Sequence, residues 1–279
     1  MSPRMPAEHG AWGLLAAPFL SAAAVAGVRA PEQWVPLALA GAAILSLFLL
    51  RGSLEGAASW RAGFEPAHIA LGAAGAAAGL GLILGYSRYQ LLALAASAVL
   101  LYLIQRALVK QHEESKALGA EEKTRRQEKR SLQAELVGVA VLSHTAPAAW
   151  IALRGQMDRT GYELWALNLL FFLGGVLYVK YRVRGLYAHR AFASFRERLG
   201  FAWPVFLYHM ALAVFLAGWI LLESRPLLLI VAFVPGILRA LQLVMQLGDR
   251  FPIRRLGWSE IAHSLVFTVL LVLAFRIGG

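Results

Sequence analysis

Nine long apolar runs dominate this sequence, and their length limits the folds that the chain can adopt. A helix that rises 1.5 Å per residue needs about 20 residues to cross roughly 30 Å of hydrocarbon. Turn signals separate the runs, which extend over residues 11–28, 33–50, 67–86, 89–108, 132–153, 162–182, 201–222, 227–247 and 259–276. The sequence therefore predicts an all-α, polytopic membrane helix bundle of nine transmembrane helices, with residues 1–279 forming a single domain.

The composition excludes several other classes of protein. Only 15% of the residues are charged and 59% are hydrophobic, whereas a soluble domain carries roughly 25% charged residues. Because the chain has no cysteine, disulfides, thiolate metal sites and cysteine nucleophiles are excluded.

The basic residues predict the orientation of the chain in the membrane. The net charge is +11, which in a soluble protein would suggest nucleic acid as a partner. If the N-terminus is cytoplasmic and nine helices alternate, most of the 27 Lys and Arg residues fall on the inner side. We therefore expect a multi-pass protein of the bacterial cytoplasmic (inner) membrane that binds no nucleic acid, and a reporter fused after Gly279 is expected outside the cytoplasm.

A charged segment of about residues 110–131 interrupts the apolar pattern. Its acidic and basic residues alternate, and Glu121 with Arg125 and Glu122 with Arg126 have the spacing of stabilising helical pairs. The segment predicts a cytoplasmic helix that is a solvated connector or, alternatively, a docking surface for anionic lipids or a partner.

Ionisable residues near the inner ends of several helices form the candidate binding site, because burying such groups in lipid is costly. These are Glu8, His9, Arg51, Arg61, Lys180, His209, Arg239, Glu260 and His263. Glu260 and His263 are three residues apart and share a helix face. Arg239 lies about 12 Å from the end of its run, too deep to reach water easily, so we expect it to be paired or functional.

The sequence lacks the common motifs of metal-binding, nucleotide-binding and nucleophilic catalytic sites. No pair of histidines has metal-ligand spacing, and there is no Walker loop, dinucleotide fingerprint or nucleophile elbow. We therefore predict no metal and no cofactor, and assign no catalytic residue. His144, in the middle of a run, is interpreted as a buried hydrogen-bonding residue.

The opening Glu8-His9-Gly10-Ala11-Trp12-Gly13, followed by an apolar run with Pro18, resembles the YwiC-like family of bacterial membrane proteins. The segment 254–260 and the last apolar run also resemble that family.

In architecture the chain is more distantly similar to the UbiA superfamily of intramembrane prenyltransferases. That resemblance implies a cytoplasmic cavity and Asp-rich loops that hold magnesium and a prenyl diphosphate. The matching loops here, residues 51–66 and 183–200, contain no Asp, so the carboxylate ligands for two magnesium ions are missing. Magnesium is expected as a cofactor only if the protein is a prenyltransferase despite the missing Asp-rich loops.

Three functions remain open from the sequence. The first is binding or handling of a lipidic, anionic-headed or isoprenoid molecule at the cytoplasmic leaflet, with membrane lipids as the expected partners. The second is a divergent prenyltransferase of the UbiA type, and the third is a transporter, for which Pro147 and Pro235 hint at broken helices. The sequence identifies no protein partner.

Overall fold

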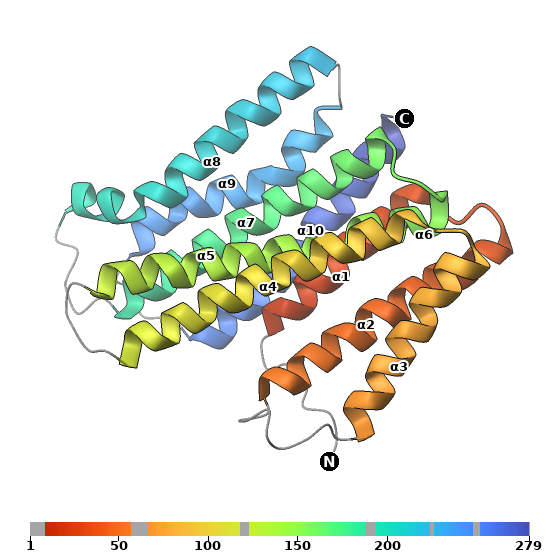
Figure 1. Ribbon diagram of the computed structural model, residues 1–279. Coiled ribbons are helices and arrows are strands. Elements are labelled where there is room, and N and C mark those ends of the chain that lie inside the picture. The colour runs from red at the N-terminus through yellow and green to blue at the C-terminus, as the bar shows by residue number, and fades with distance from the viewer. Residues whose placement is uncertain are drawn as a thin grey trace. The chain divides into compact units, whose positions relative to one another are not determined.

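The computed structural model describes residues 9–56, 66–117, 123–187, 194–223, 226–247 and 252–278, in which all regular elements are helices (Figure 1). They are α1 (His9–Ala26), η1 (Pro31–Gln33), α2 (Trp34–Gly56), α3 (Pro66–Leu80), η3 (Gly81–Gly85), α4 (Gln90–Ala117), α5 (Lys123–Ser143), α6 (Thr145–Arg154), α7 (Arg159–Tyr187), α8 (Phe195–Glu223), α9 (Leu228–Gln246) and α10 (Ile253–Ile277).

Each predicted apolar run lies on one helix or on two consecutive helices. Among the described residues, eight helical spans are long and apolar enough to cross a membrane, and Ala11–Ala26 is a shorter apolar helix. Three of the spans join consecutive elements, η1 with α2, α3 with η3, and α5 with α6. The predicted all-α, polytopic membrane fold is confirmed.

The chain forms two compact units. Unit 1 comprises Met1–Ser97 and His144–Trp165, and unit 2 comprises Ala98–Ser143 and Ala166–Gly279. The boundaries fall within α4, at the break between α5 and α6, and within α7. The assignment of residues 1–279 to a single domain stays a prediction.

Small residues allow the helices of unit 1 to pack closely. In this unit α1 packs on α6, and α2 packs on both α3 and α6 (Figure 1). Ala22 of α1 is fully buried against Ala146 and Ala149 of α6. A side chain added at Gly75 of α3 would lie 3.4 Å from the Cβ atom of Ser46 on α2. Close backbone approach of this kind is a common basis of helix association in membranes.

In unit 2, α9 packs between two other helices of the unit. It contacts α8 and α10, and Leu243 and Val244 of α9 are buried in a cluster with Ala202 and Val205 of α8. Polar groups close the C-terminal end of α9, where the last carbonyls of a helix have no intrahelical donor. Arg198 of α8 donates to the Met245 carbonyl at 2.8 Å.

The same end of α9 receives a second guanidinium. Arg182 of α7 donates to the carbonyl of Gln246, and its side chain is buried. Two arginines from neighbouring helices thus take the place of the glycine cap that ends many helices.

The described parts of the charged segment 110–131 are helical, but they belong to two long helices and do not form a separate connector helix. α4 continues to Ala117, and α5 begins at Lys123. Neither helix contains Gly or Pro in this region, so each helix continues past its apolar part. The pairing partners Glu121 and Glu122 lie outside the described residues.

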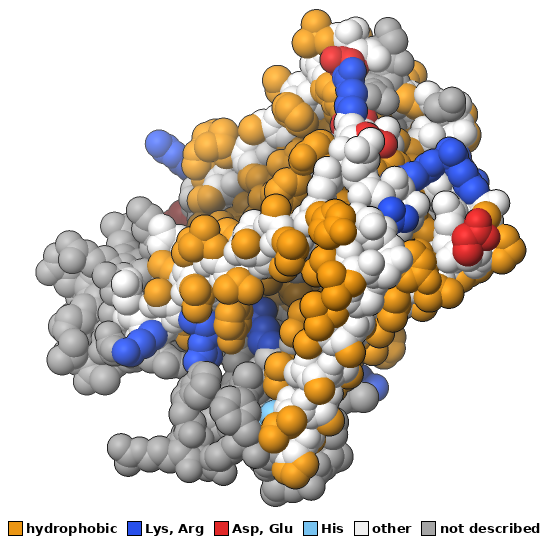
Figure 2. All heavy atoms as spheres, turned by 45° about the vertical axis from the view of Figure 1, so that its right-hand side comes forward, with side chains coloured by type: hydrophobic (Ala, Val, Ile, Leu, Met, Phe, Trp, Pro, Cys, Tyr) orange, Lys and Arg blue, Asp and Glu red, His pale blue; other side chains and the backbone are white. Residues whose placement is uncertain are grey.

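Apolar side chains cover much of the helical surface on the face shown in Figure 2. Large exposed residues include Leu84, Val214 and Leu221. A water-soluble protein does not expose apolar surface on this scale, whereas a membrane protein presents it to lipid.

Candidate functional site

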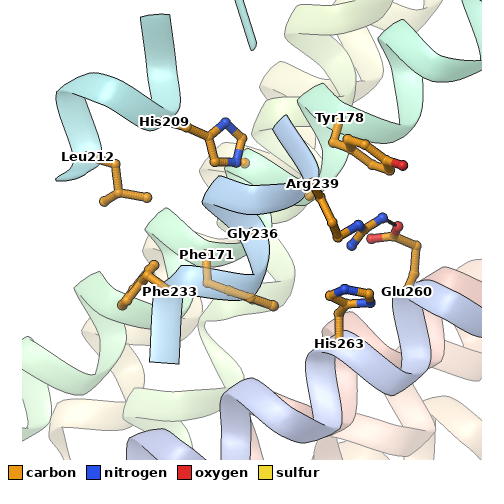
Figure 3. Close-up of a pocket in the computed structure, with 11 residues that line it drawn as sticks. Phe171, Tyr178, His209, Leu212, Phe233, Gly236, Arg239, Glu260 and His263 are labelled. Carbon is orange, nitrogen blue, oxygen red and sulfur yellow. Dashed lines mark hydrogen bonds and ion pairs between the residues drawn. The ribbon is translucent and has the colours of Figure 1, made fainter. Parts of the chain in front are cut away.

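A small pocket in unit 2 brings together four ionisable side chains of α8–α10, namely His209, Arg239, Glu260 and His263. Residues from α7–α10 line it, namely Phe171, Gly174, Gly175, Tyr178, His209, Leu212, Phe233, Gly236, Arg239, Glu260 and His263 (Figure 3). The space open to the centre of a water molecule is about 20 Å³. A cavity needs roughly 10–15 Å³ by this measure to hold one water, so the pocket accommodates one small polar group.

An ion pair lies at one side of the pocket. The guanidinium of Arg239 on α9 donates to Oε1 of Glu260 on α10 (Figure 3). The Arg239 guanidinium carbon is also 4.0 Å from the ring centroid of Tyr178 on α7, which is the geometry of a cation–π contact. Arg239 is only 9% exposed, so both interactions compensate for a charge that is removed from water.

Two histidines face the pocket in the same chemical form. Nδ1 of His209 is 2.8 Å from the Val205 carbonyl oxygen, and Nδ1 of His263 is 2.6 Å from the Ser259 carbonyl oxygen. A carbonyl can only accept, so each Nδ1 carries the hydrogen, and in the neutral ring Nε2 is then an acceptor. Among the described residues, neither Nε2 has a hydrogen-bond partner.

Glycines keep the space beside these acceptor atoms open. A Cβ atom at Gly236 of α9 would lie 3.9 Å from Nε2 of His209, and one at Gly174 of α7 would lie 3.1 Å from the same atom. A Cβ atom at Gly175 would lie 3.6 Å from Oε2 of Glu260. Side chains at these three positions would therefore fill the polar part of the pocket.

Aromatic rings form the apolar side. Phe171 of α7 stacks on Phe267 of α10 with 3.8 Å between ring centroids, and Phe233 of α9 meets Phe267 edge-on at 5.2 Å. The pocket thus joins an apolar wall to a cluster of ionisable groups, as sites for amphiphilic ligands do.

The structure brings four of the nine residues predicted for the site into one pocket. These four are His209, Arg239, Glu260 and His263. The expectation that Arg239 is paired is confirmed by Glu260.

The other five predicted residues lie elsewhere or are not described. Lys180 donates instead to Oε1 of Glu135 at 2.6 Å and to Ser131 at 2.9 Å. Arg51 is half-buried on α2 of unit 1. Glu8 and Arg61 lie outside the described residues, as does the side chain of His9.

Tyr178 and the three glycines were not predicted from the sequence. A usable signal was present, because Gly174 and Tyr178 are four residues apart and share a helix face. A Gly-Gly pair inside an apolar run also marks a place where another group approaches the backbone closely. The Pro235-Gly236 step is a similar signal in α9.

A second buried polar cluster lies in unit 1, where the membrane span breaks between α5 and α6. Nε2 of His144 is 3.1 Å from the Ser97 hydroxyl oxygen, and the ring of His144 meets Trp165 edge-on at 5.2 Å. Thr145 donates to the Leu15 carbonyl of α1 at 3.0 Å. Pro147 lies in the first turn of α6, where its missing N–H leaves no bond unmade. The structural role expected for His144 is confirmed by its bond to Ser97.

The fold and the pocket define a class of protein, the polytopic α-helical membrane proteins with a polar pocket enclosed among their helices. Within that class, residues 5–121 match the model of the YwiC-like family, which confirms the resemblance over this part of the chain. All residues of the pocket lie outside the matched range.

One relative shows how far similarity to curated proteins extends. A protein of Haemophilus influenzae, described as an uncharacterized protein, is 28% identical over 155 residues, which cover 54% of this chain and 56% of the relative. The chain thus spans little more than half the length of this curated relative. No solved structure matches the chain, so the similarity to the UbiA architecture stays a prediction.

Proposed function

We propose that this protein binds a lipidic molecule in the bacterial inner membrane and holds its polar head in the pocket of α7–α10. The observation that carries the proposal is the meeting of four ionisable groups in one pocket among apolar helices, where His209 and Arg239 are buried and Glu260 and His263 are partly buried. Ionisable groups within a membrane protein are costly, and they mark functional sites more often than other positions do.

The aromatic wall supports a ligand with an apolar part. Phe171 and Phe233 line the pocket on the side away from the ion pair (Figure 3), and they offer a surface for a hydrocarbon or isoprenoid chain. A ligand with a polar head and an apolar tail satisfies both sides of the pocket, whereas a purely polar solute satisfies only one.

The excess of basic residues on the predicted cytoplasmic side supports the proposed location of the site, in the inner membrane and in its cytoplasmic leaflet. With the N-terminus in the cytoplasm, the inner ends of α7 and α9 carry Tyr187 and Gln246. Tyr178 lies nine residues from the first end and Arg239 seven residues from the second. At 1.5 Å per residue the pocket would lie roughly 10–14 Å from the cytoplasmic helix ends, which supports a site in the inner leaflet.

The test is to identify the lipids that co-purify with the protein. Native lipid nanodiscs containing the full chain are extracted and their lipids are analysed by mass spectrometry. The double variant Arg239→Leu/Glu260→Leu replaces the ion pair of the pocket with apolar side chains without leaving an unpaired charge. Gly218→Ala on α8 is the matched control, because an added Cβ atom there meets nothing within 4 Å.

We expect one lipid species to be enriched with the wild type and with Gly218→Ala, and to be at least about tenfold depleted in the double variant. That factor corresponds to roughly 1.4 kcal/mol of binding free energy. An identical lipid profile for all three proteins would contradict the proposal.

A further inference from the structure

The hydrogen-bonding groups that face the pocket restrict the chemistry of the head that it binds. The Nε2 atoms of His209 and His263 are acceptors in the neutral rings, because each Nδ1–H is held by a carbonyl of its own helix. Glu260 adds a carboxylate whose Oε2 lies beside Gly175. A ligand group that donates hydrogen bonds therefore finds several acceptors here.

The charge balance disfavours an anionic head. Arg239 is the cation of the pocket, and Glu260 already neutralises it. An added phosphate or carboxylate would lie beside the Glu260 carboxylate at low dielectric, where like charges repel strongly. An uncharged head leaves the ion pair undisturbed.

The size of the pocket leads to the same result. About 20 Å³ is open to the centre of a water molecule, which is room for one water-sized group. A single hydroxyl has this size, whereas a phosphate with four oxygens requires the helices to move apart.

From these observations we infer that the head held by the proposed lipid site is a single uncharged hydroxyl, of an alcohol or a phenol, which donates its hydrogen bond to Nε2 of His209. The inference rests on the proposed function and specifies the class of ligand. It replaces the anionic head expected from the sequence with a neutral donor.

The experiment compares three probes that share one C15 isoprenoid tail and differ only in the head. Farnesol carries a hydroxyl, farnesyl methyl ether has no donor, and farnesyl monophosphate is an anion. Equilibrium binding of radiolabelled farnesol to the purified full chain is measured, with the other two probes as competitors. The variants are Gly236→Ala and Gly175→Ala, with Gly218→Ala as the control.

Each test variant adds a methyl group beside one acceptor atom of the pocket, at a distance that requires no rearrangement of the helices. The new methyl group would lie 3.9 Å from Nε2 of His209 in Gly236→Ala and 3.6 Å from Oε2 of Glu260 in Gly175→Ala, which are ordinary contact distances. We expect farnesol to bind at least about tenfold more tightly than the ether, since the ether leaves a buried acceptor unsatisfied. Gly236→Ala should weaken farnesol binding about fivefold or more, and Gly218→Ala should not change it.

Each alternative outcome has a distinct meaning. If alcohol and ether compete equally and Gly236→Ala weakens both, the pocket binds a lipid but the hydroxyl inference is wrong. If the monophosphate binds most tightly and is sensitive to the same variant, the head is an anion and the inference is again wrong. If no probe binds, or if binding ignores both pocket variants, the inference and the proposed lipid site fail together.

Discussion

The two units of this protein use buried histidine in opposite ways. In unit 1, His144 closes the break between α5 and α6, with its Nε2 at the Ser97 hydroxyl and its ring against Trp165. In unit 2, His209 and His263 bond only through Nδ1 to their own helices, and their Nε2 atoms face a pocket. Burial of an ionisable residue in a membrane protein therefore does not identify a binding site by itself. A binding site is indicated when a polar atom of that residue faces a pocket and has no hydrogen-bond partner.

The largest effect is expected from breaking the ion pair of the pocket. Arg239→Leu alone leaves the partly buried Glu260 carboxylate without its counter-charge and should reduce the free energy of unfolding by about 2–3 kcal/mol. The double variant Arg239→Leu/Glu260→Leu should recover most of that loss. Reversible unfolding in SDS measures both values, and equal losses for the single and double variants would show that the unpaired Glu260 carboxylate does not destabilise the fold.

A pair of histidine variants tests the comparison directly. His144→Leu loses the bond to Ser97 and the edge contact with Trp165, so it should reduce the free energy of unfolding by about 1–3 kcal/mol. His263→Leu should cost less than about 1 kcal/mol, because the Ser259 carbonyl keeps its place in the helical ladder. Thermal melting in detergent ranks the two variants, and the reverse order would overturn the assignment of a closed cluster in unit 1 and an open one in unit 2.

A smaller difference is expected between two buried hydroxyls. Thr145→Val removes a bond from α6 to the Leu15 carbonyl of α1 and should cost about 1 kcal/mol. Ser264→Ala removes a bond to the Glu260 carbonyl within α10 itself, where the effect should stay within about 0.5 kcal/mol because such local bonds add little to a helix. SDS unfolding of both variants gives the comparison. If Thr145→Val reduces the free energy of unfolding as little as is expected for Ser264→Ala, the hydrogen bond between α6 and α1 does not stabilise unit 1.

The smallest effect is expected at the second ion pair of unit 2. Lys180 and Glu135 are 2.6 Å apart, but the Glu135 side chain is 45% exposed. A double-mutant cycle with Lys180→Met and Glu135→Gln should give a coupling energy below about 1 kcal/mol. A coupling energy as large as that between Arg239 and Glu260 would show that solvent exposure does not determine the strength of these two ion pairs.

The succession of helical spans along the chain could be predicted because the membrane determines the length and the polarity of each span. Each apolar run of suitable length becomes a helical span, and the depth of Arg239 along its run was enough to predict that it is paired or functional. His209 and His263 were identified in the same way, from ionisable residues inside apolar runs.

The remainder of the site depended on packing that one sequence does not reveal. The contact between Arg239 and Tyr178 joins helices that are about 60 residues apart, and no local pattern links them. Lys180 was assigned to the site by its position near the inner end of a helix, yet its direction along α7 takes it to Glu135 of α5 instead. Depth can be read from a sequence, whereas the direction of a side chain between helices depends on how they pack.

The two arginines at the end of α9 have a consequence for how the protein is assembled. Arg182 and Arg198 belong to α7 and α8, which a ribosome delivers before α9. When the last turn of α9 emerges, both donors for its carbonyls are already present, and no residue of α10 is needed to close it. Arg182 and Arg198 can therefore cap α9 as soon as its last turn is made, and this part of unit 2 can be completed while the chain is still being synthesised.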